Sequence, residues 1–308
     1  MLRSVAALAA ALLLAAPAWA GSPITLSCTA TTDCASAFAA ASHGFFARHG
    51  LDVKITPIAL NSNIPAALMS DSIQIGGPTP SVFLQAVDGG LDLVALATAS
   101  VTSKETVDGA AAVARTGSGI DKPADFAGHR VGVPGIGAFL DVLFRQSLIQ
   151  HGIDPGKITF VEVTFPTMSD ALKGGAVDGV VSANPFLARI LAAGTGKVVS
   201  NFLADVPDGE PQILYASTRA WAGAHQPEVA AFRAAIAEGA DFVRANPDAA
   251  REDVAKFTKL PIAVLKTMKL SWSSAAIDKA QLDWWVGVMR GQKMLQSTPD
   301  TAALIPAP

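Results

Sequence analysis

The sequence "IGGPTPSVFLQA", which runs from Ile75 to Ala86, combines the end of a strand, a corner of small residues and the start of a helix. Thr79 is a suitable N-cap, and Pro80 suits the first helical position. The backbone amides of Ser81 and Val82 would then be free to bind an anion, and the preceding glycines would let a ligand approach the backbone. The stretch therefore predicts a strand–helix unit with a ligand-binding corner.

On both sides of this stretch, apolar runs of strand length alternate with helical patterns, as is typical of parallel sheets covered by helices. We therefore predict an α/β fold with two successive α/β units. The first has strands at residues 24–30, 51–59, 73–75 and 91–97 and helices at 34–49, 64–69 and 80–88. The second has strands at 130–133, 158–163 and 177–181 and helices at 138–151, 168–172 and 185–193.

The C-terminal third has a mainly helical pattern, with helices predicted at residues 226–245, 247–257, 261–265 and 277–294. In the last of these, Leu282, Trp285 and Met289 recur at near-helical spacing, which favours a packing face. We expect these helices to brace the first unit.

The N-terminus has the three parts of a secretory signal peptide. Arg3 precedes an apolar run at residues 5–16, and Ala18-Trp19-Ala20 forms an A-x-A cleavage site. The run is shorter than the ~20 residues that a membrane span needs, so we expect residues 1–20 to be removed on export. Cys28 and Cys34 would then form a disulfide in an oxidising compartment or remain as two buried thiols.

Composition and motifs argue against several functions. The net charge is −3 and Lys and Arg are not clustered, so nucleic acid is not an expected partner. The sequence has no H-E-x-x-H, G-x-S-x-G, P-loop or C-x-x-C motif, and "GVPGIGAF" at residues 132–139 lacks the dinucleotide spacing G-x-G-x-x-G. We therefore expect no catalytic residue, no metal and no cofactor.

Polar or glycine-rich corners follow the predicted strands of both units, where open α/β sheets bind ligands. Each corner alone is consistent with ordinary helix capping. If the units face each other, however, the helix starts converge on one cleft, where dipoles and hydroxyls could hold an anionic group without a full positive charge. Phe139, Phe165, Met168 and Phe186 could form its apolar wall. The candidate ligand-binding residues are Thr29, Thr31, Thr32, Gly77, Thr79 and Ser81 in the first unit and Gly135, Ile136, Gly137, Ala138, Phe139, Thr164 and Asn184 in the second.

Five stretches, spread over nearly the whole chain, resemble periplasmic substrate-binding proteins of ABC importers. They are "ASHGFFARHGLDVKI", "DSIQIGGPTPSVFLQAVDGGLDLVALA", "DKPADFAGHRVGVPG", "ALKGGAVDGVVSANPF" and "QLDWWVGVMRGQKML". The matching branch is the nitrate/sulfonate/taurine type, which includes binders of thiamine-pyrimidine precursors. The resemblance implies a type II periplasmic-binding-protein fold, in which two α/β lobes joined by a two-strand hinge close on a ligand. Lobe 1 would comprise residues 21–114 and 213–308, and lobe 2 residues 115–212.

The resemblance also implies a function. The protein would be a monomeric, non-enzymatic solute-binding protein that captures a small organic anion in the periplasm, such as a sulfonate or an aromatic or other carboxylate. It would deliver this ligand to a membrane permease and ATPase.

The chain departs from the family pattern in the second lobe. Where the family often has Trp-Glu-Pro, it has Ala183-Asn184-Pro185, and the missing carboxylate argues against a ligand with an amino group. The loop at residues 135–138 also carries fewer hydroxyls than usual, so we expect the first lobe to hold the head group.

Two alternatives remain open at this stage. One is a thiaminase-like or pyrimidine-synthase-like enzyme on the same fold, with Cys28 or Cys34 as the nucleophile. The other is a ligand-sensing partner of a membrane receptor.

Overall fold

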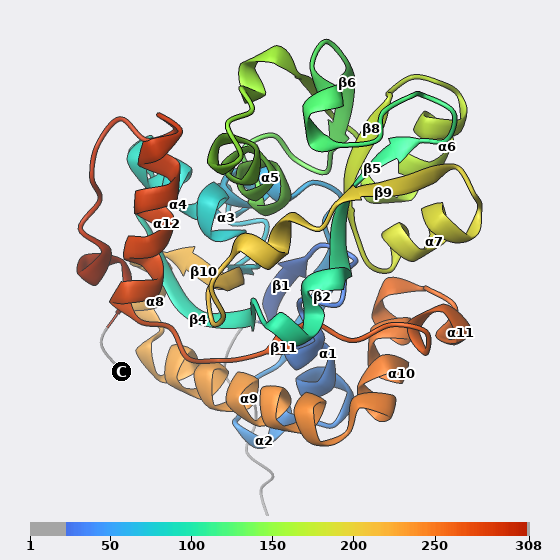
Figure 1. Ribbon diagram of the computed structural model, residues 1–308. Coiled ribbons are helices and arrows are strands. Elements are labelled where there is room, and N and C mark those ends of the chain that lie inside the picture. The colour runs from blue at the N-terminus through green and yellow to red at the C-terminus, as the bar shows by residue number, and fades with distance from the viewer. Residues whose placement is uncertain (1–22, 307–308) are drawn as a thin grey trace, which may run out of the picture.

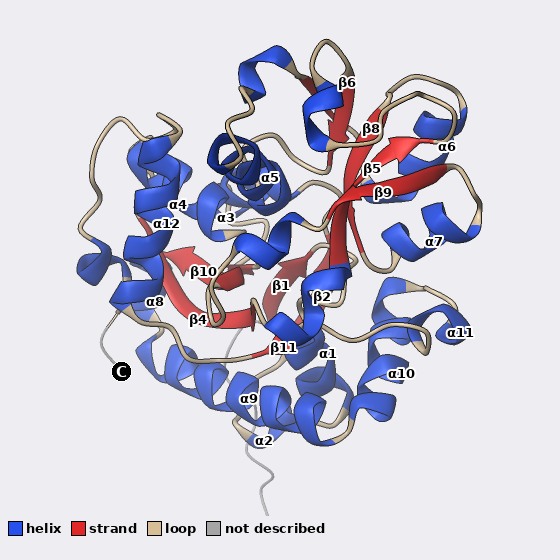
Figure 2. Ribbon diagram, in the orientation of Figure 1, coloured by secondary structure: helices blue, strands red, loops and turns tan. Residues whose placement is uncertain are grey.

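The computed structural model describes residues 23–306 and contains two β-sheets with helices packed against them (Figures 1 and 2). The predicted signal peptide, residues 1–20, lies outside the described residues. Within residues 23–306, no helix combines the length and the apolar character needed to cross a bilayer.

The first sheet has six strands in the order β11-β4-β10-β3-β1-β2. Its strands β1 and β2 are parallel, with Ile24 opposite Val53, whereas β10 runs antiparallel to β4. Every residue of β4 is buried, which explains its continuous run of apolar and small residues. The strands are β1 (Ile24–Cys28), β2 (Val53–Pro57), β3 (Ile75–Gly76), β4 (Leu93–Val101), β10 (Pro211–Thr218) and β11 (Trp272–Ser273).

The first lobe also holds most of the helices. They are α1 (Ala35–Ser42), α2 (Phe45–Arg48), α3 (Ile64–Met69), α4 (Pro80–Asp88), α8 (Arg219–Ala224), α9 (Gln226–Ala245), α10 (Pro247–Thr258), α11 (Ile262–Leu265) and α12 (Lys279–Gly291). The predicted helix at residues 34–49 is divided because Gly44 adopts a left-handed conformation with φ of 72°. As expected, α9 and α10 pack against this lobe, mainly on α1.

The second sheet has the order β7-β6-β8-β5-β9. Its strands are β5 (Ala110–Arg115), β6 (Arg130–Val133), β7 (Thr159–Glu162), β8 (Gly179–Ala183) and β9 (Gly196–Ser200), with helices α5 (Phe139–Gln150), α6 (Met168–Lys173) and α7 (Phe186–Ala192). Strand β6 pairs in parallel with β7 and β8, and β5 is antiparallel to β8 and β9. The α/β class and the two-lobed arrangement predicted from sequence are confirmed.

The chain passes between the two sheets twice. Strand β5, which the sequence analysis assigned to lobe 1 as far as residue 114, pairs entirely within the second sheet. Strand β10 pairs within the first sheet from Pro211 onward. By sheet membership, the passages lie at residues 102–109 and 201–210.

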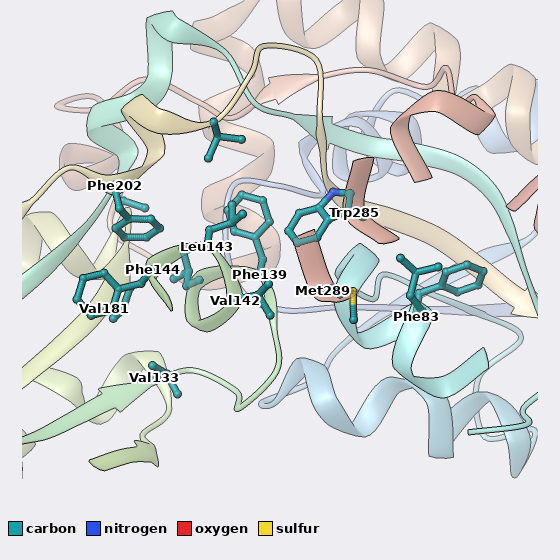
Figure 3. Packing of buried hydrophobic residues seen from close by; sticks show 14 of the residues in the cluster. Phe83, Val133, Phe139, Val142, Leu143, Phe144, Val181, Phe202, Trp285 and Met289 are labelled. Carbon is teal, nitrogen blue, oxygen red and sulfur yellow. The ribbon is translucent and has the colours of Figure 1, made fainter. Parts of the chain in front are cut away.

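A hydrophobic cluster continues from one lobe into the other beside these passages (Figure 3). It includes Phe83 of α4, Trp285 of α12 and Phe139 of α5. The rings of Phe139 and Trp285 have centroids 5.7 Å apart, and Gln292, just after α12, donates to the carbonyl oxygen of Val142 at 3.0 Å. Helix α12 therefore has the predicted packing face, but it contacts both lobes.

Glu210, in the second passage, has a carboxyl group in an unfavourable position. Its backbone is fixed by two hydrogen bonds with Thr102. Within the described residues, its Oε2 atom is buried and has no hydrogen-bond partner. Burial, together with repulsion from Asp278, raises the pKa of Glu210 from 4.5 to about 7.

This raised pKa predicts a pH-dependent stability. Because the folded state holds the proton more tightly, the contribution of Glu210 is fully present below pH 4.5 and is lost as the pH rises through about 7. We expect the urea midpoint of the wild-type protein to fall between about pH 5 and about pH 8. Glu210→Gln should remove this part of the fall; equal losses in variant and wild type would contradict the assignment.

Candidate functional site

A cavity lies between loops of the two lobes. Its volume is about 80 Å³, below the few hundred Å³ of a pocket for a drug-sized molecule, so it suits a compact ligand. Of the residues predicted from sequence, those that line it are Thr29, Thr31, Thr32 and Thr79 from the first lobe and Ala138, Phe139 and Asn184 from the second. The corners of both lobes therefore meet around one shared cavity.

The other predicted residues do not line this cavity. Gly77 packs against the disulfide, since a Cβ atom there would lie 3.1 Å from Sγ of Cys28 and 3.4 Å from Sγ of Cys34. Ser81 is buried beside Thr79, and Ile136 is 49% exposed. The remaining members of this group are Gly135, Gly137 and Thr164.

The corner before α4 is capped as predicted, and the cap uses one of the amides expected to be free. Oγ1 of Thr79 accepts from the amide of Val82 at 3.3 Å. The amide of Thr79 donates to Oδ1 of Asn61 at 2.8 Å, and Nδ2 of Asn61 donates to the carbonyl oxygen of Gly77 at 2.9 Å. Asn61, which the sequence analysis missed, lines the cavity and has a second Nδ2 hydrogen left to donate.

The glycine loop before α5 does not present the amides expected of an anion site. The amide of Ile136 donates to Oε1 of Glu162 at 3.0 Å, and that of Gly137 to Oδ2 of Asp141 at 2.8 Å. Burial raises the pKa of Asp141, although Arg145 lies beside it. Carboxylates of the protein already bind these amides. The hydrogen-bond donors for the head group of an anion are therefore expected from the first lobe.

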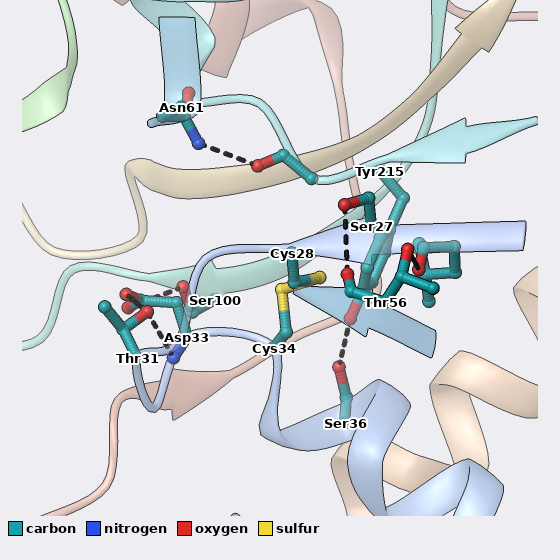
Figure 4. Close-up of a disulfide and its surroundings, with 12 residues drawn as sticks. Ser27, Cys28, Thr31, Asp33, Cys34, Ser36, Thr56, Asn61, Ser100 and Tyr215 are labelled. Atoms are coloured by element: carbon teal, nitrogen blue, oxygen red, sulfur yellow. Dashed lines mark hydrogen bonds between the residues drawn. A yellow bond between two sulfur atoms is a disulfide. The ribbon is translucent and has the colours of Figure 1, made fainter. Parts of the chain in front are cut away.

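The two cysteines form a disulfide that encloses the loop at residues 29–33 (Figure 4). The choice left open by the sequence is thus decided, and neither sulfur is a free thiol. The structure therefore gives no support to an enzyme with Cys28 or Cys34 as nucleophile.

Asp33 lies at the end of this loop and lines the cavity. Its Oδ2 accepts from the hydroxyl of Thr31 at 2.7 Å, and its Oδ1 accepts from Ser271 at 2.7 Å and from Ser100 at 3.2 Å. Ser271 also contacts the hydroxyl of Thr32, with 2.7 Å between the two oxygens. A cluster of four hydroxyls is therefore built around one carboxylate, the Asp33 cluster (Asp33, Thr31, Thr32, Ser100 and Ser271).

Lys269 also lines the cavity, and its Nζ donates to the carbonyl oxygen of Glu105. The capping pattern alone predicted an anion site without a full positive charge here. Lys269 lies with Ser271 in the segment between α11 and β11, far along the chain from the predicted lining residues and without a motif to mark it. The cavity thus contains an ammonium group that only the tertiary fold reveals.

Apolar side chains of the second lobe also line the cavity, as expected for Phe139 and Phe165. Phe165 stacks on Phe186, with ring centroids 5.4 Å apart, so Phe186 supports this wall from behind. Met168 is fully buried in a separate cluster under the second sheet.

Across residues 23–306, no group of three His, Cys, Asp or Glu side chains is placed to hold a metal ion.

A family model described as "NMT1/THI5 like" matches residues 31–250. The chain belongs to the NMT1/THI5-like family. No curated protein matches the sequence. Solved structures share the fold of this NMT1/THI5-like chain, the type II periplasmic-binding-protein fold, with two α/β lobes and a cleft between them.

Three of these structures cover most of the chain. The alkanesulfonate-binding protein SsuA from Xanthomonas axonopodis pv. citri, bound to MOPS, is 18% identical with a TM-score of 0.76, covering 93% of this chain and 99% of SsuA. The ligand-binding component of an ABC-type import system from Staphylococcus aureus, with zinc bound, is 16% identical with a TM-score of 0.78, covering 93% and 97%. The periplasmic nitrate-binding protein NrtA from Synechocystis PCC 6803 is 17% identical with a TM-score of 0.75, covering 92% and 84%.

Proposed function

We propose that this protein is the periplasmic solute-binding component of an ABC importer and that it captures a small organic anion between its lobes. The observation that carries the proposal is the cavity itself, whose lining combines hydrogen-bond donors at Lys269 and Asn61 with apolar side chains such as Phe139 and Phe165. The solved structures that share the fold include binders of alkanesulfonate and of nitrate, which supports an anionic ligand. The protein would act as a monomer and deliver its ligand to a permease and ATPase.

The ligand class follows from the two sides of the cavity. Lys269 donates one hydrogen bond to Glu105 and has two further N–H donors for a sulfonate or carboxylate. The wall of Phe139, Leu140 and Phe165 suits an alkyl or aromatic body rather than a bare inorganic ion. Sulfonates and aromatic or other carboxylates fit this arrangement.

A contact between the lobes supports capture by closure. Nε2 of Gln85, in α4 of the first lobe, donates to the carbonyl oxygen of Gly137 in the second lobe at 2.8 Å. This hydrogen bond links the two lobes and would break when they separate.

The proposal is tested by thermal unfolding with a panel of alkanesulfonates, arylsulfonates, aromatic carboxylates and nitrate. A ligand at about 100 times its Kd should raise Tm by about 5 °C or more, because it binds only the folded state. No shift with any member of the panel would sink the proposal.

Lys269→Gln should weaken binding of the best anion about tenfold or more, because a charge-assisted hydrogen bond is lost. Isothermal titration calorimetry measures this change. Lys266→Gln is the matched control, since Lys266 is exposed and does not line the cavity, and it should leave the Kd unchanged. If Lys269→Gln and Lys266→Gln bind the anion with equal affinity, Lys269 does not contact the ligand.

A further inference from the structure

The hydroxyl protons of the Asp33 cluster have directions that the hydrogen bonds fix. Thr31, Ser100 and Ser271 each donate their single hydroxyl proton to the carboxylate of Asp33. Since Ser271 has no second proton to give, the 2.7 Å contact between Ser271 and Thr32 must be donated by Thr32. The backbone amide of Ser271 also donates to Oγ1 of Thr32, at 3.4 Å. Three hydroxyl protons therefore point at the carboxylate of Asp33, and the proton of Thr32 points at the oxygen of Ser271.

This orientation reverses the role that the sequence suggests for these threonines. A hydroxyl whose proton is already committed can only accept a further hydrogen bond. Thr31 and Thr32 line the cavity, so they present lone pairs to a ligand rather than protons. The carboxylate of Asp33, which accepts three hydrogen bonds, has acceptor capacity for about one more. This end of the cavity is matched to a hydrogen-bond donor and repels an anion.

The same cavity has donors close by. Lys269 precedes Ser271 by two residues and lines the cavity with it, and Asn61 contributes its spare Nδ2 hydrogen. One part of the site thus attracts an anionic group, and another part attracts an N–H or an ammonium group. A ligand with both groups pairs the donors Lys269 and Asn61 with its anionic group and the acceptor Asp33 with its N–H group.

We infer that Asp33 determines specificity: the ligand is a small organic anion that also carries an amine or another N–H donor, which is held by Asp33, Thr31 and Thr32. The inference rests on the proposed function for the anionic half of the ligand. It also changes an expectation from the sequence. The carboxylate missing at Asn184 is supplied instead by Asp33, so an amino group in the ligand is favoured.

The test compares matched triplets by calorimetry: ethanesulfonate, 2-aminoethanesulfonate and ethylamine, then benzenesulfonate, 4-aminobenzenesulfonate and aniline. In at least one triplet, wild-type protein should bind the amino-sulfonate about tenfold or more tightly than the sulfonate alone, as expected for a hydrogen bond to a charged group. Asp33→Asn should abolish this preference, because its amide donates where the carboxylate accepts.

Two further variants keep the test decisive. Asp52→Asn makes the same chemical change at an exposed residue that does not line the cavity, and it should retain the preference for the amino-sulfonate. If Asp33→Asn fails to fold, as judged by circular dichroism, Thr31→Val replaces it. Valine has nearly the size of threonine but lacks the hydroxyl acceptor, so this variant should reduce the preference.

The outcomes separate this inference from the proposed function. If sulfonates bind with no preference for the amino member, or if Asp33→Asn keeps the preference, the role of Asp33 is wrong and the proposed function stands. If amines bind and sulfonates do not, the proposal of an anionic ligand is wrong, and the assignment of Asp33 as the acceptor for an amine is kept. If no member of either triplet binds, the role of Asp33 is overturned, and the proposed function is then decided by the wider panel of sulfonates, aromatic carboxylates and nitrate.

Discussion

Gly239→Ala is expected to destabilise the protein by about 3 kcal/mol, as a severe case of overpacking. Gly239 lies in α9 where this helix crosses α1. A Cβ atom at this position would lie 2.2 Å from the carbonyl oxygen of Ser36 and 3.0 Å from its carbonyl carbon. Both atoms belong to the backbone, so a rotamer change cannot relieve the clash, and the helices would have to move apart.

Helix propensity predicts the opposite sign, since alanine is favoured over glycine inside a helix by about 1 kcal/mol. Gly287→Ala in α12 isolates that effect, because a Cβ atom there has no neighbour within 4 Å. Chemical unfolding should show Gly287→Ala to be neutral or slightly stabilising and Gly239→Ala to be strongly destabilising. Similar midpoints for the two variants would show that α1 and α9 are not in close contact.

Trp285→Ala is expected to cost about 3–5 kcal/mol of stability, the range found when a large aromatic side chain is removed from a core. Trp285 is fully buried, and its Nε1 donates to the carbonyl oxygen of Pro211 at 3.1 Å. Its ring also contacts Phe139 of the second lobe (Figure 3). The substitution therefore removes packing within the first lobe and packing between the lobes together.

Two control variants separate the effect of removing Trp285 from the effect of removing any tryptophan. Trp285→Phe keeps an aromatic ring but loses the N–H donor, so its cost should be intermediate. Trp272→Ala removes a tryptophan that is 40% exposed and should cost much less. If Trp285→Ala unfolds at the same urea concentration as Trp272→Ala, the cluster that joins the lobes does not contribute as described.

The sequence predicted the local units well because their signals are local. Thr79 and Pro80 start α4 as the capping pattern indicates, and the helices at residues 64–69 and 226–245 begin and end where expected. The division at Gly44 was missed because glycine inside a helical pattern is ambiguous until its φ is known.

The candidate site could be predicted only in part because half of its chemistry depends on tertiary contacts. Capping patterns indicated which loops reach the cavity, and Thr29, Thr79 and Asn184 are there. They could not indicate that Glu162 and Asp141 would bind the amides of the glycine loop. Nor could they place Lys269, whose segment reaches the cavity only through the packing of α11 and β11.

The disulfide between Cys28 and Cys34 affects when the protein can bind its ligand tightly. The enclosed residues 29–33 include Thr31, Thr32 and Asp33, which all line the cavity. A newly made chain with reduced sulfurs would lack the covalent tie at the base of this loop. We therefore expect the reduced chain to bind its ligand more weakly than the oxidised chain does.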